Sequence, residues 1–290
     1  MVLTVDQLSL TVKNFTILNA VDLTLDNGEI LCVAGRNGAG KTSLLKCISG
    51  LENRYTGTLK YSEELGTDRI KDNVGIMIDG ISVYSYLSGE ENLDIIRRYY
   101  GLPFSAVNET LQLVGLKDSA KKKVKYYSAG MKQRLAIAMA FIHRPSLVIL
   151  DEPLNALDPE AIVEIRNLIN KMNQEFFTTF IISSHSLEEI GKLFTRLIIV
   201  KSGTVVLNVT RDEVQRFQMF KGQAKENSAI AQSLHAQPNL IHRMDKDGTI
   251  QIATSNQELI RSVLSEDSGV EWQQPEKINL EDIYLFANSK

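Results

Sequence analysis

The stretch EILCVAGRNGAGKTSLLKCISG, residues 29–50, carries the pattern that decides the fold. Its first part, EILCVA, is a nearly continuous apolar run that predicts a buried strand of a parallel sheet, and SLLKCISG predicts a helix. Between them lies GRNGAGKTS, residues 35–43, where glycines precede a lysine and a threonine. This spacing, with a strand before it and a helix after it, is typical of a phosphate-binding loop.

Each part of the loop suits a phosphate group. Glycine lets backbone N–H groups converge on phosphate oxygens, and the N-terminus of the following helix adds partial positive charge. We expect Lys41 to reach the terminal phosphates of a nucleotide and Thr42 to offer its hydroxyl to Mg²⁺. The other loop residues expected to contact the nucleotide are Gly35, Asn37, Gly38, Ala39, Gly40 and Ser43. A glycine-rich turn with an accidental lysine is the alternative, and the strand and helix around the loop disfavour it.

Two acids end the next strong strand pattern. The apolar runs SLVILDE, residues 146–152, and FTTFIISSH, residues 177–185, flank a helical pattern, which is the β-α-β order of a parallel sheet. Asp151 and Glu152 therefore emerge at the carboxyl edge of a buried strand, where such sheets bind ligands. Asp151 is suited to hold Mg²⁺ through water, and Glu152 to orient or deprotonate an attacking water. Taken alone, the two acids could also be the solvated start of a loop.

The flanking patterns indicate an α/β fold with additions. TVDQLSLTV, TILNAVDLTL and GTLKYS alternate apolar and polar residues and predict an antiparallel flank before residue 62. A helical insertion is expected at about residues 81–144, opening with a capping box formed by Ser88 and Glu91. SerGly at residues 202–203 predicts a hairpin turn.

The chain becomes more polar after residue 213, which predicts a boundary between a domain at residues 1–213 and a small α+β domain at residues 214–290. The small domain reads as strand, helix (residues 229–236), hairpin around residues 247–248, helix (residues 256–264), strand and a final helix in LEDIYLF.

Composition narrows the function classes. The net charge of −3 and pI of about 5.9 give no basic footprint, so we expect no nucleic-acid partner. The basic run KKKVK, residues 121–125, is interpreted as a solvated face. Cys32 and Cys47 lack metal or disulfide spacing and are expected to be core residues of a reducing compartment. We find no membrane-spanning run and no signal peptide, which predicts a cytosolic chain.

Three further motifs resemble those of a known protein family. YSAGMKQR, residues 127–134, opens a helix before Asp151, and NALD, residues 155–158, and SSH, residues 183–185, follow. In this order the motifs resemble those of ATP-binding cassette (ABC) ATPases, over roughly residues 1–213. The resemblance implies a P-loop NTPase (RecA-like) fold that hydrolyses ATP with Mg²⁺, with His185 as the switch histidine. It also implies a head-to-tail dimer, in which Ser128, Ala129 and Gly130 of one copy cap the ATP held by the other.

The chain departs from the family pattern at three places. The signature has Ala129 and Met131 where Gly and Gln are usual. The family's adenine-stacking aromatic aligns with Val12, which leaves Phe15 as the candidate for that contact. Asp79 stands at the position of the family's Q-loop glutamine, where it is expected to approach Mg²⁺ and the attacking water. The alternative is a tolerated substitution without a role in the site. As an isolated residue, Asp79 before Gly80 would be read as a surface turn.

The resemblance favours a transporter subunit over other ABC ATPases. The interval between Lys41 and Asp151 is too short for the coiled coils of the DNA-acting class, and a single cassette differs from the two of the ribosomal class. We expect a separate transmembrane permease to contact residues 79–87, at the cytoplasmic face of the cell membrane. The acid at the Q-loop position, the Tyr-Ser-x-Gly-Met signature and the C-terminal extension closing on LEDIYLF resemble exporter ATPases for bacitracin resistance, lantibiotic immunity and phenol-soluble modulins. This resemblance implies export of peptides or antimicrobials. Multidrug, ion and polysaccharide transporters, and non-transport ABC ATPases, are the alternatives.

Overall fold

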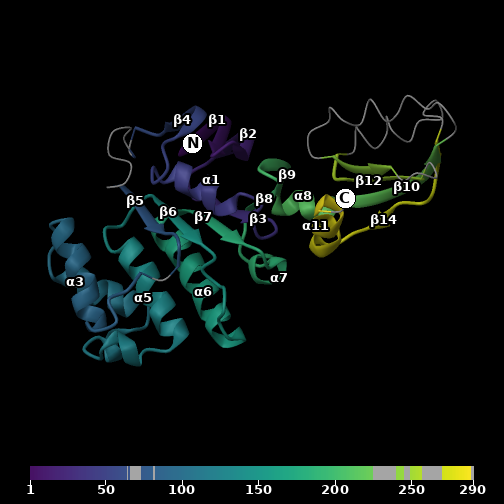
Figure 1. Cartoon of the computed structure of the whole chain (residues 1–290). Coiled ribbons are helices and arrows are strands. Elements are labelled where there is room, and N and C mark those ends of the chain that lie inside the picture. The colour runs from purple at the N-terminus through teal and green to yellow at the C-terminus, as the bar shows by residue number, and fades with distance from the viewer. Residues whose placement is uncertain are drawn as a thin grey trace.

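The computed structural model describes residues 1–63, 65, 73–80, 82–224, 240–244, 249–256 and 270–288 (Figure 1). In this part of the chain the expected α/β architecture is present. A mixed sheet of strands in the order β5-β6-β7-β3-β8-β9 forms the centre. Its strands are β3 (Ile30–Ala34), β5 (Val74–Met77), β6 (Leu147–Asp151), β7 (Thr179–Ser184), β8 (Arg196–Lys201) and β9 (Thr204–Thr210). All but β9 run parallel.

The strand order places the motifs at one edge. β6, β7 and β3 are neighbours, and the segments at their carboxyl ends are Asp151-Glu152, residues 183–185 and the phosphate loop. β3, β6 and β7 are buried along their whole length, which explains why their sequences are continuous apolar runs rather than alternating ones. The sheet thus brings together three segments that are far apart in sequence.

Helices cover both faces of the central sheet. α1 (Lys41–Ile48) packs on one face together with the antiparallel sheet, and α5 (Ala129–Phe141) and α6 (Pro159–Phe176) pack on the other (Figure 1). Alternate residues of β3 take part in the two apolar cores: Cys32 packs in the core with α5 and α6, and Leu31 in the core with α1. Cys32 and Cys47 are buried free thiols, as expected.

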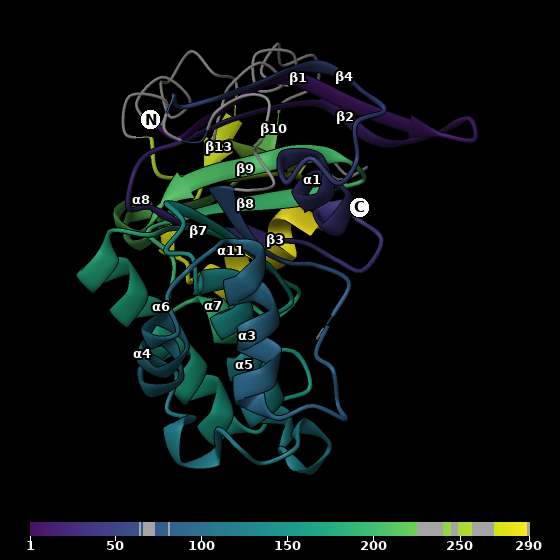
Figure 2. The ribbon, with the colours of Figure 1, turned by 90° about the vertical axis from the view of Figure 1, so that its left-hand side faces the viewer.

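The antiparallel flank is confirmed. β1 (Leu3–Val12) pairs with β2 (Phe15–Leu25) and with β4 (Tyr55–Tyr61). This three-stranded sheet lies over α1 (Figure 2). The β1–β2 turn is tight because Lys13 and Asn14 both have positive φ, the geometry of a two-residue hairpin. The predicted hairpin at Ser202-Gly203 turns in the same way, with φ of 48° and 82°, between β8 and β9.

The helical insertion comprises α3 (Gly89–Tyr99), α4 (Ser105–Leu113) and α5. The expected capping box is present: Ser88 accepts a hydrogen bond from the backbone N–H of Glu91, and Glu91 accepts one from Ser88 N. In the basic run, the four lysines are exposed around a fully buried Val124, so this run is a solvated face as expected.

The C-terminal part forms a second sheet. α8 (Arg211–Arg216) leads into β10 (Gln218–Ala224), which pairs with β12 (Thr249–Thr254), β13 (Val270–Trp272) and β14 (Glu276–Lys277). β11 (Ile241–Met244) pairs with β12, so the predicted hairpin is confirmed, although its turn lies outside the described residues. The helices predicted at 229–236 and 256–264 also lie outside them.

The last helix, α11 (Leu280–Asn288), returns to the cassette. Its buried residues Ile283, Phe286 and Ala287 belong to the same apolar core as residues of α7 (Leu187–Ile190) and β8. Packing therefore joins the C-terminal part to the cassette, while the boundary at residue 213 stays a prediction. Among the described residues, no helix has the length and apolar character needed to cross a membrane.

Candidate active site

The phosphate loop has the backbone geometry that its glycines allow. Gly38 and Gly40 have φ of 79° and 107°, in the region that favours glycine, and α1 begins directly after Gly40. A side chain at Gly35 would collide with the carbonyl oxygen of Val200. Residues 36–38 are exposed, whereas Ala39 is buried and its carbonyl accepts a hydrogen bond from Gly203 N, at 2.9 Å. The loop is thus anchored at its base and open at its tip, where an anion can approach.

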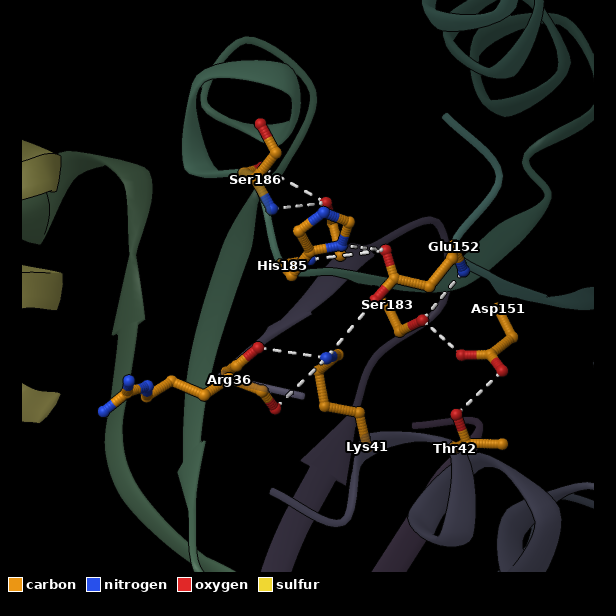
Figure 3. A network of polar contacts seen from close by, with 10 residues as sticks. Arg36, Lys41, Thr42, Asp151, Glu152, Ser183, His185 and Ser186 are labelled. Atoms are coloured by element: carbon orange, nitrogen blue, oxygen red, sulfur yellow. Dashed lines mark hydrogen bonds and ion pairs between the residues drawn. The ribbon is translucent and has the colours of Figure 1, made fainter. Parts of the chain in front are cut away.

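Lys41 lies under the loop, with only 6% of its side chain exposed (Figure 3). Its ammonium group donates to the carbonyl oxygen of Gly35 at 3.0 Å and forms an ion pair with Glu152 Oε1 at 3.2 Å. A buried ammonium group is stable only with such partners. These contacts hold the charge of Lys41 at the centre of the site.

Asp151 and Thr42 form a pair of oxygen ligands at the start of α1. The Thr42 hydroxyl donates to Asp151 Oδ2 at 2.8 Å, and the other carboxylate oxygen accepts from Ser183 Oγ at 2.5 Å (Figure 3). Ser183 Oγ in turn accepts from Glu152 N at 2.9 Å. Two hydroxyl groups, one from helix α1 and one from strand β7, therefore fix the orientation of the Asp151 carboxylate.

Ser183 was not among the residues singled out in the sequence as functional. It joins Asp151 to the backbone of Glu152 and is fully buried at the carboxyl end of β7. The signal in the sequence was a pair of serines closing an apolar run beside the expected acids, because a polar side chain there must find a buried partner.

Glu152 occupies the middle of the site. Its backbone has φ of 51°, a left-handed conformation that is unfavourable for a glutamate and is held by the hydrogen bond to Ser183. Its Oε2 lies 2.8 Å from His185 Nδ1, and its Oε1 faces Lys41. Because the lysine and the histidine hold separate oxygens, the carboxylate points in one direction, toward the loop.

Asp79 has a different partner from the one expected. Its carboxylate forms an ion pair with Lys46 Nζ at 2.8 Å, and 65% of the side chain is exposed. Within the described residues no hydrogen bond or ion pair links Asp79 to Thr42 or Asp151. The role of Asp79 near the metal therefore stays a prediction.

The signature residues lie elsewhere in the fold. Ser128 caps α5 by accepting a hydrogen bond from Met131 N at 3.2 Å, and Ser128 and Ala129 are exposed. Gly130 is buried, and a side chain there would press on Ala161 of α6. α5 and α1 cover opposite faces of the sheet, so the structure does not bring the signature to its own loop (Figure 1). Phe15 is 77% exposed at the start of β2, paired with Val12 across the hairpin.

The network of Figure 3 has the groups needed to bind a nucleotide and cleave its terminal phosphoanhydride bond. The loop and Lys41 present positive charge to an anion, and Glu152 can accept a proton from water. The Thr42 and Asp151 oxygens are the kind of ligand that a divalent cation on a nucleotide prefers. The chemistry available is therefore phosphoryl transfer from a nucleotide to water.

Comparisons with known proteins identify the family. The family model described as ABC transporter matches residues 18–155. The bacitracin transport ATP-binding protein BcrA of Enterococcus faecalis is 36% identical over 82% of this chain and 79% of its own. The lantibiotic transport ATP-binding protein SrtF of Streptococcus pyogenes is 34% identical over 72% of this chain and 91% of its own.

Other matches extend to the C-terminal part and to the fold. An uncharacterised ABC transporter ATP-binding protein of Bacillus subtilis, YdbJ, is 30% identical over 99% of this chain and 96% of its own. A solved ATP-binding subunit of an ABC transporter superposes with a TM-score of 0.65 and 27% identity, covering 74% of this chain and 92% of its own. The identities of 30–36% to BcrA, SrtF and YdbJ, over most of both chains, show common ancestry. The protein therefore belongs to the ATP-binding subunits of ABC transporters and is an ATPase.

Proposed function

We propose that the protein drives an exporter of peptides or antimicrobial compounds, together with a separate membrane subunit. The observation that carries the proposal is the likeness to a bacitracin transport protein over most of both chains. A lantibiotic transport protein of similar identity supports the same cargo class. In this proposal two copies dimerise head to tail at the cytoplasmic face of the membrane.

Glu152 is proposed to orient and deprotonate the water that attacks the γ-phosphate of ATP. Support comes from its fixed carboxylate, held between Lys41 at 3.2 Å and His185 at 2.8 Å. When phosphate occupies the loop, Lys41 donates to phosphate oxygens, which leaves Glu152 free to accept the proton of the water. His185 keeps the carboxylate aligned and responds to the γ-phosphate through it.

The residues at the start of α1 fit Mg²⁺, which accompanies ATP in this proposal. Thr42 Oγ1 and Asp151 Oδ2 lie 2.8 Å apart beside the loop, and both are hard oxygen donors. Mg²⁺ bound with the nucleotide supplies charge neutralisation on the phosphates. The contribution of this chain is to present the two oxygens in a fixed orientation, with Ser183 holding the far side of the carboxylate.

The separation of the signature from the loop supports the proposed head-to-tail dimer. Ser128 and Ala129 are exposed at the N-terminus of α5, on the face of the sheet opposite α1. A serine hydroxyl and a helix N-terminus suit a γ-phosphate, and the phosphate that they cap is that of a second copy. Phe15, exposed at the β1–β2 hairpin and paired with Val12, is the proposed contact of the adenine base.

The membrane subunit is proposed to dock beside residues 79–87. A groove of about 340 Å³ lies between β5 and the helices α3 and α5. The residues that line it include the aliphatic and aromatic side chains of Ile76, Met77, Ile78, Ile96, Tyr99 and His143. Tyr99 of the groove is exposed, and Tyr84 and Tyr86, with ring centroids 6.1 Å apart, expose further aromatic surface within residues 79–87. We propose that a cytoplasmic helix of the membrane subunit fills this groove, because an exposed apolar patch of this kind favours a protein partner.

His143 lines the groove with an aromatic ring whose two nitrogens are buried. Its ring stacks on Tyr100 at a centroid distance of 4.1 Å, and neither ring nitrogen has a hydrogen-bond partner in the described residues. Burial lowers the pKa of His143 to about 4, so the ring is neutral at pH 7 and offers one donor and one acceptor.

The experiment is complementation of a strain from which the gene is deleted. We expect the deletion to increase sensitivity to bacitracin or a lantibiotic, and the wild-type gene to restore resistance while Glu152→Gln does not. If the deletion leaves sensitivity to all peptide antimicrobials unchanged but alters multidrug or ion export, the cargo class proposed here is wrong.

Docking is tested in the same strain. The double variant Tyr84→Ala/Tyr86→Ala should keep ATPase activity in the purified chain but lose complementation. Phe177→Ala removes an aromatic ring that is 78% exposed and lies outside both residues 79–87 and the groove lining, so it serves as the control that still complements. Full complementation by the double tyrosine variant would place the membrane subunit elsewhere.

A further inference from the structure

The C-terminal helix α11 packs on the segment that carries the switch histidine. α7 begins two residues after His185, and its buried residues Leu187 and Ile190 share an apolar core with Ile283 of α11. At the end of α7, Leu280 Cδ2 lies 3.4 Å from where a Cβ on Gly191 would stand. α11 therefore closes directly over α7, and Gly191 leaves room for Leu280.

The other end of α11 is fixed to the central sheet. Lys201, the last residue of β8, donates from Nζ to the carbonyl oxygen of Ala287 at 3.1 Å. This carbonyl belongs to the last turn of α11, where unpaired carbonyls and the helix dipole favour a cation. Ala287 itself is buried in the shared core. α11 is thus held at both ends by the cassette.

One face of α11 points to the cassette. Leu280, Ile283, Tyr284 and Ala287 follow the spacing of one helical face, and they are half-buried or buried, whereas Leu285 is 67% exposed. Burial raises the pKa of Tyr284, Arg36 lowers it and Glu152 raises it, so the phenol lies within the electrostatic field of the active site. In Figure 3 the side chain of Arg36 extends away from Lys41, toward the yellow C-terminal ribbon.

We infer that α11 is a positioning element for hydrolysis, which holds α7 so that His185 stays within hydrogen-bonding distance of Glu152. The physical reason is the shortness of the connection: only Ser186 separates His185 from α7, so a shift of α7 moves the imidazole. Displacements of about 1 Å at a reacting group can cost about 10²-fold in rate. The C-terminal part would then be required for ATP turnover itself, whichever cargo is exported.

The test is a double-mutant cycle on the full chain. Ile283→Ala removes apolar atoms that pack in the core shared with α7, and we expect it to lower kcat for ATP hydrolysis about tenfold, because His185 loses alignment. The dissociation constant for ATP should change less than about twofold, since the phosphate loop does not depend on α7. Ile283→Val, which keeps most of the side chain, should restore most of the activity. Leu285→Ala, on the exposed face of the same helix, is the matched control and should leave kcat unchanged.

The second arm shows whether His185 is the intermediary. Single-turnover rates with enzyme in excess measure low activities, so Ile283→Ala is also made in a His185→Ala background. If α11 acts through His185, Ile283→Ala has less than a twofold effect there. An equal loss in both backgrounds, or an unchanged kcat in Ile283→Ala alone, overturns the inference. If circular dichroism shows that Ile283→Ala is unfolded, Leu280→Ala replaces it in the same double-mutant cycle, with the same criteria. Leu280→Ala truncates a side chain that is only half-buried.

Discussion

Two acids of this protein occupy matching positions and have different surroundings. Asp79 follows β5 and Glu152 follows β6, two parallel strands that are neighbours in the sheet. Both have left-handed backbones, with φ of 63° and 51°, and both form an ion pair with a lysine of α1. Yet 65% of the Asp79 side chain is exposed and only 23% of Glu152.

Burial makes the difference between the two pairs. Lys46 is partly exposed beside Asp79, so water and salt screen their attraction, and such pairs contribute about 0–1 kcal/mol. Lys41 and Glu152 are shielded from water, so the removal of one leaves the other without its main partner. A position at the end of a strand beside a lysine therefore does not by itself place an acid in the buried network. Contact with the buried network is what separates Glu152 from Asp79.

The largest expected effect is that of Glu152→Gln. The amide keeps the size of the side chain but cannot accept the proton of the water, so kcat for ATP hydrolysis should fall by roughly 10² to 10⁴. ATP binding, measured by calorimetry, should persist. A turnover equal to that of the wild type would remove Glu152 from the role of base.

Next in size is the contrast between the two lysines of α1. Lys41→Ala should cost about 3 kcal/mol of phosphate stabilisation, seen as a loss of about 10²-fold in kcat/KM for ATP, because a buried donor to the phosphates is lost. Lys46→Ala, five residues along the same helix, is the matched control, and it should change kcat/KM less than about threefold. Equal losses in the two variants would contradict the distinction drawn between a buried and an exposed pair.

His185→Ala tests the third member of the Glu152 network. Without the imidazole one carboxylate oxygen loses its partner at 2.8 Å, so Glu152 gains freedom and kcat should fall about tenfold. The KM for ATP should stay within about twofold, since Lys41 and the loop are intact. His242→Ala, on β11 of the C-terminal sheet, is the control for loss of a histidine and should leave both constants unchanged.

The parts of the fold that the sequence predicted are those with local signals. The phosphate loop, the capping box at Ser88 and the hairpin at Ser202-Gly203 depend on residues a few positions apart, and the structure has all of them. The buried strands were visible because β3, β6 and β7 are apolar throughout. The resemblance to ABC ATPases then indicated which of these motifs belong to one nucleotide site.

What could not be predicted depends on contacts between distant residues. The pairing of Asp79 with Lys46 requires the register of β5 against the rest of the sheet, which no local pattern encodes. The packing of α11 on α7 joins residues far apart in the chain, and LEDIYLF alone indicates only an amphipathic helix. Ser183 was missed because a serine at the end of a strand becomes informative only when the neighbouring strand is known to carry Asp151.

The smallest expected effects belong to Asp79, and they test the comparison most sharply. Asp79→Asn removes the negative charge and keeps the oxygen and the length of the side chain. Asparagine also tolerates the left-handed backbone at φ of 63°, so the loop conformation should be retained. If the ion pair with Lys46 is the main interaction of Asp79, kcat should change less than about threefold and the free energy of unfolding by less than about 1 kcal/mol.

The Mg²⁺ dependence of hydrolysis separates this outcome from a role at the metal. With Asp79 outside the metal site, the Mg²⁺ concentration that gives half-maximal rate should be the same in wild type, Asp79→Asn and Asp79→Gln. The glutamine variant is the family's usual residue, but its longer chain has no preference for the left-handed backbone, so its stability should be the lower of the two by about 1 kcal/mol. A tenfold higher Mg²⁺ requirement in Asp79→Asn would show that the charge of Asp79 reaches the metal when ATP is bound. The exposed acid would then join Glu152 in the site, because nucleotide would draw residues 79 and 80 away from Lys46.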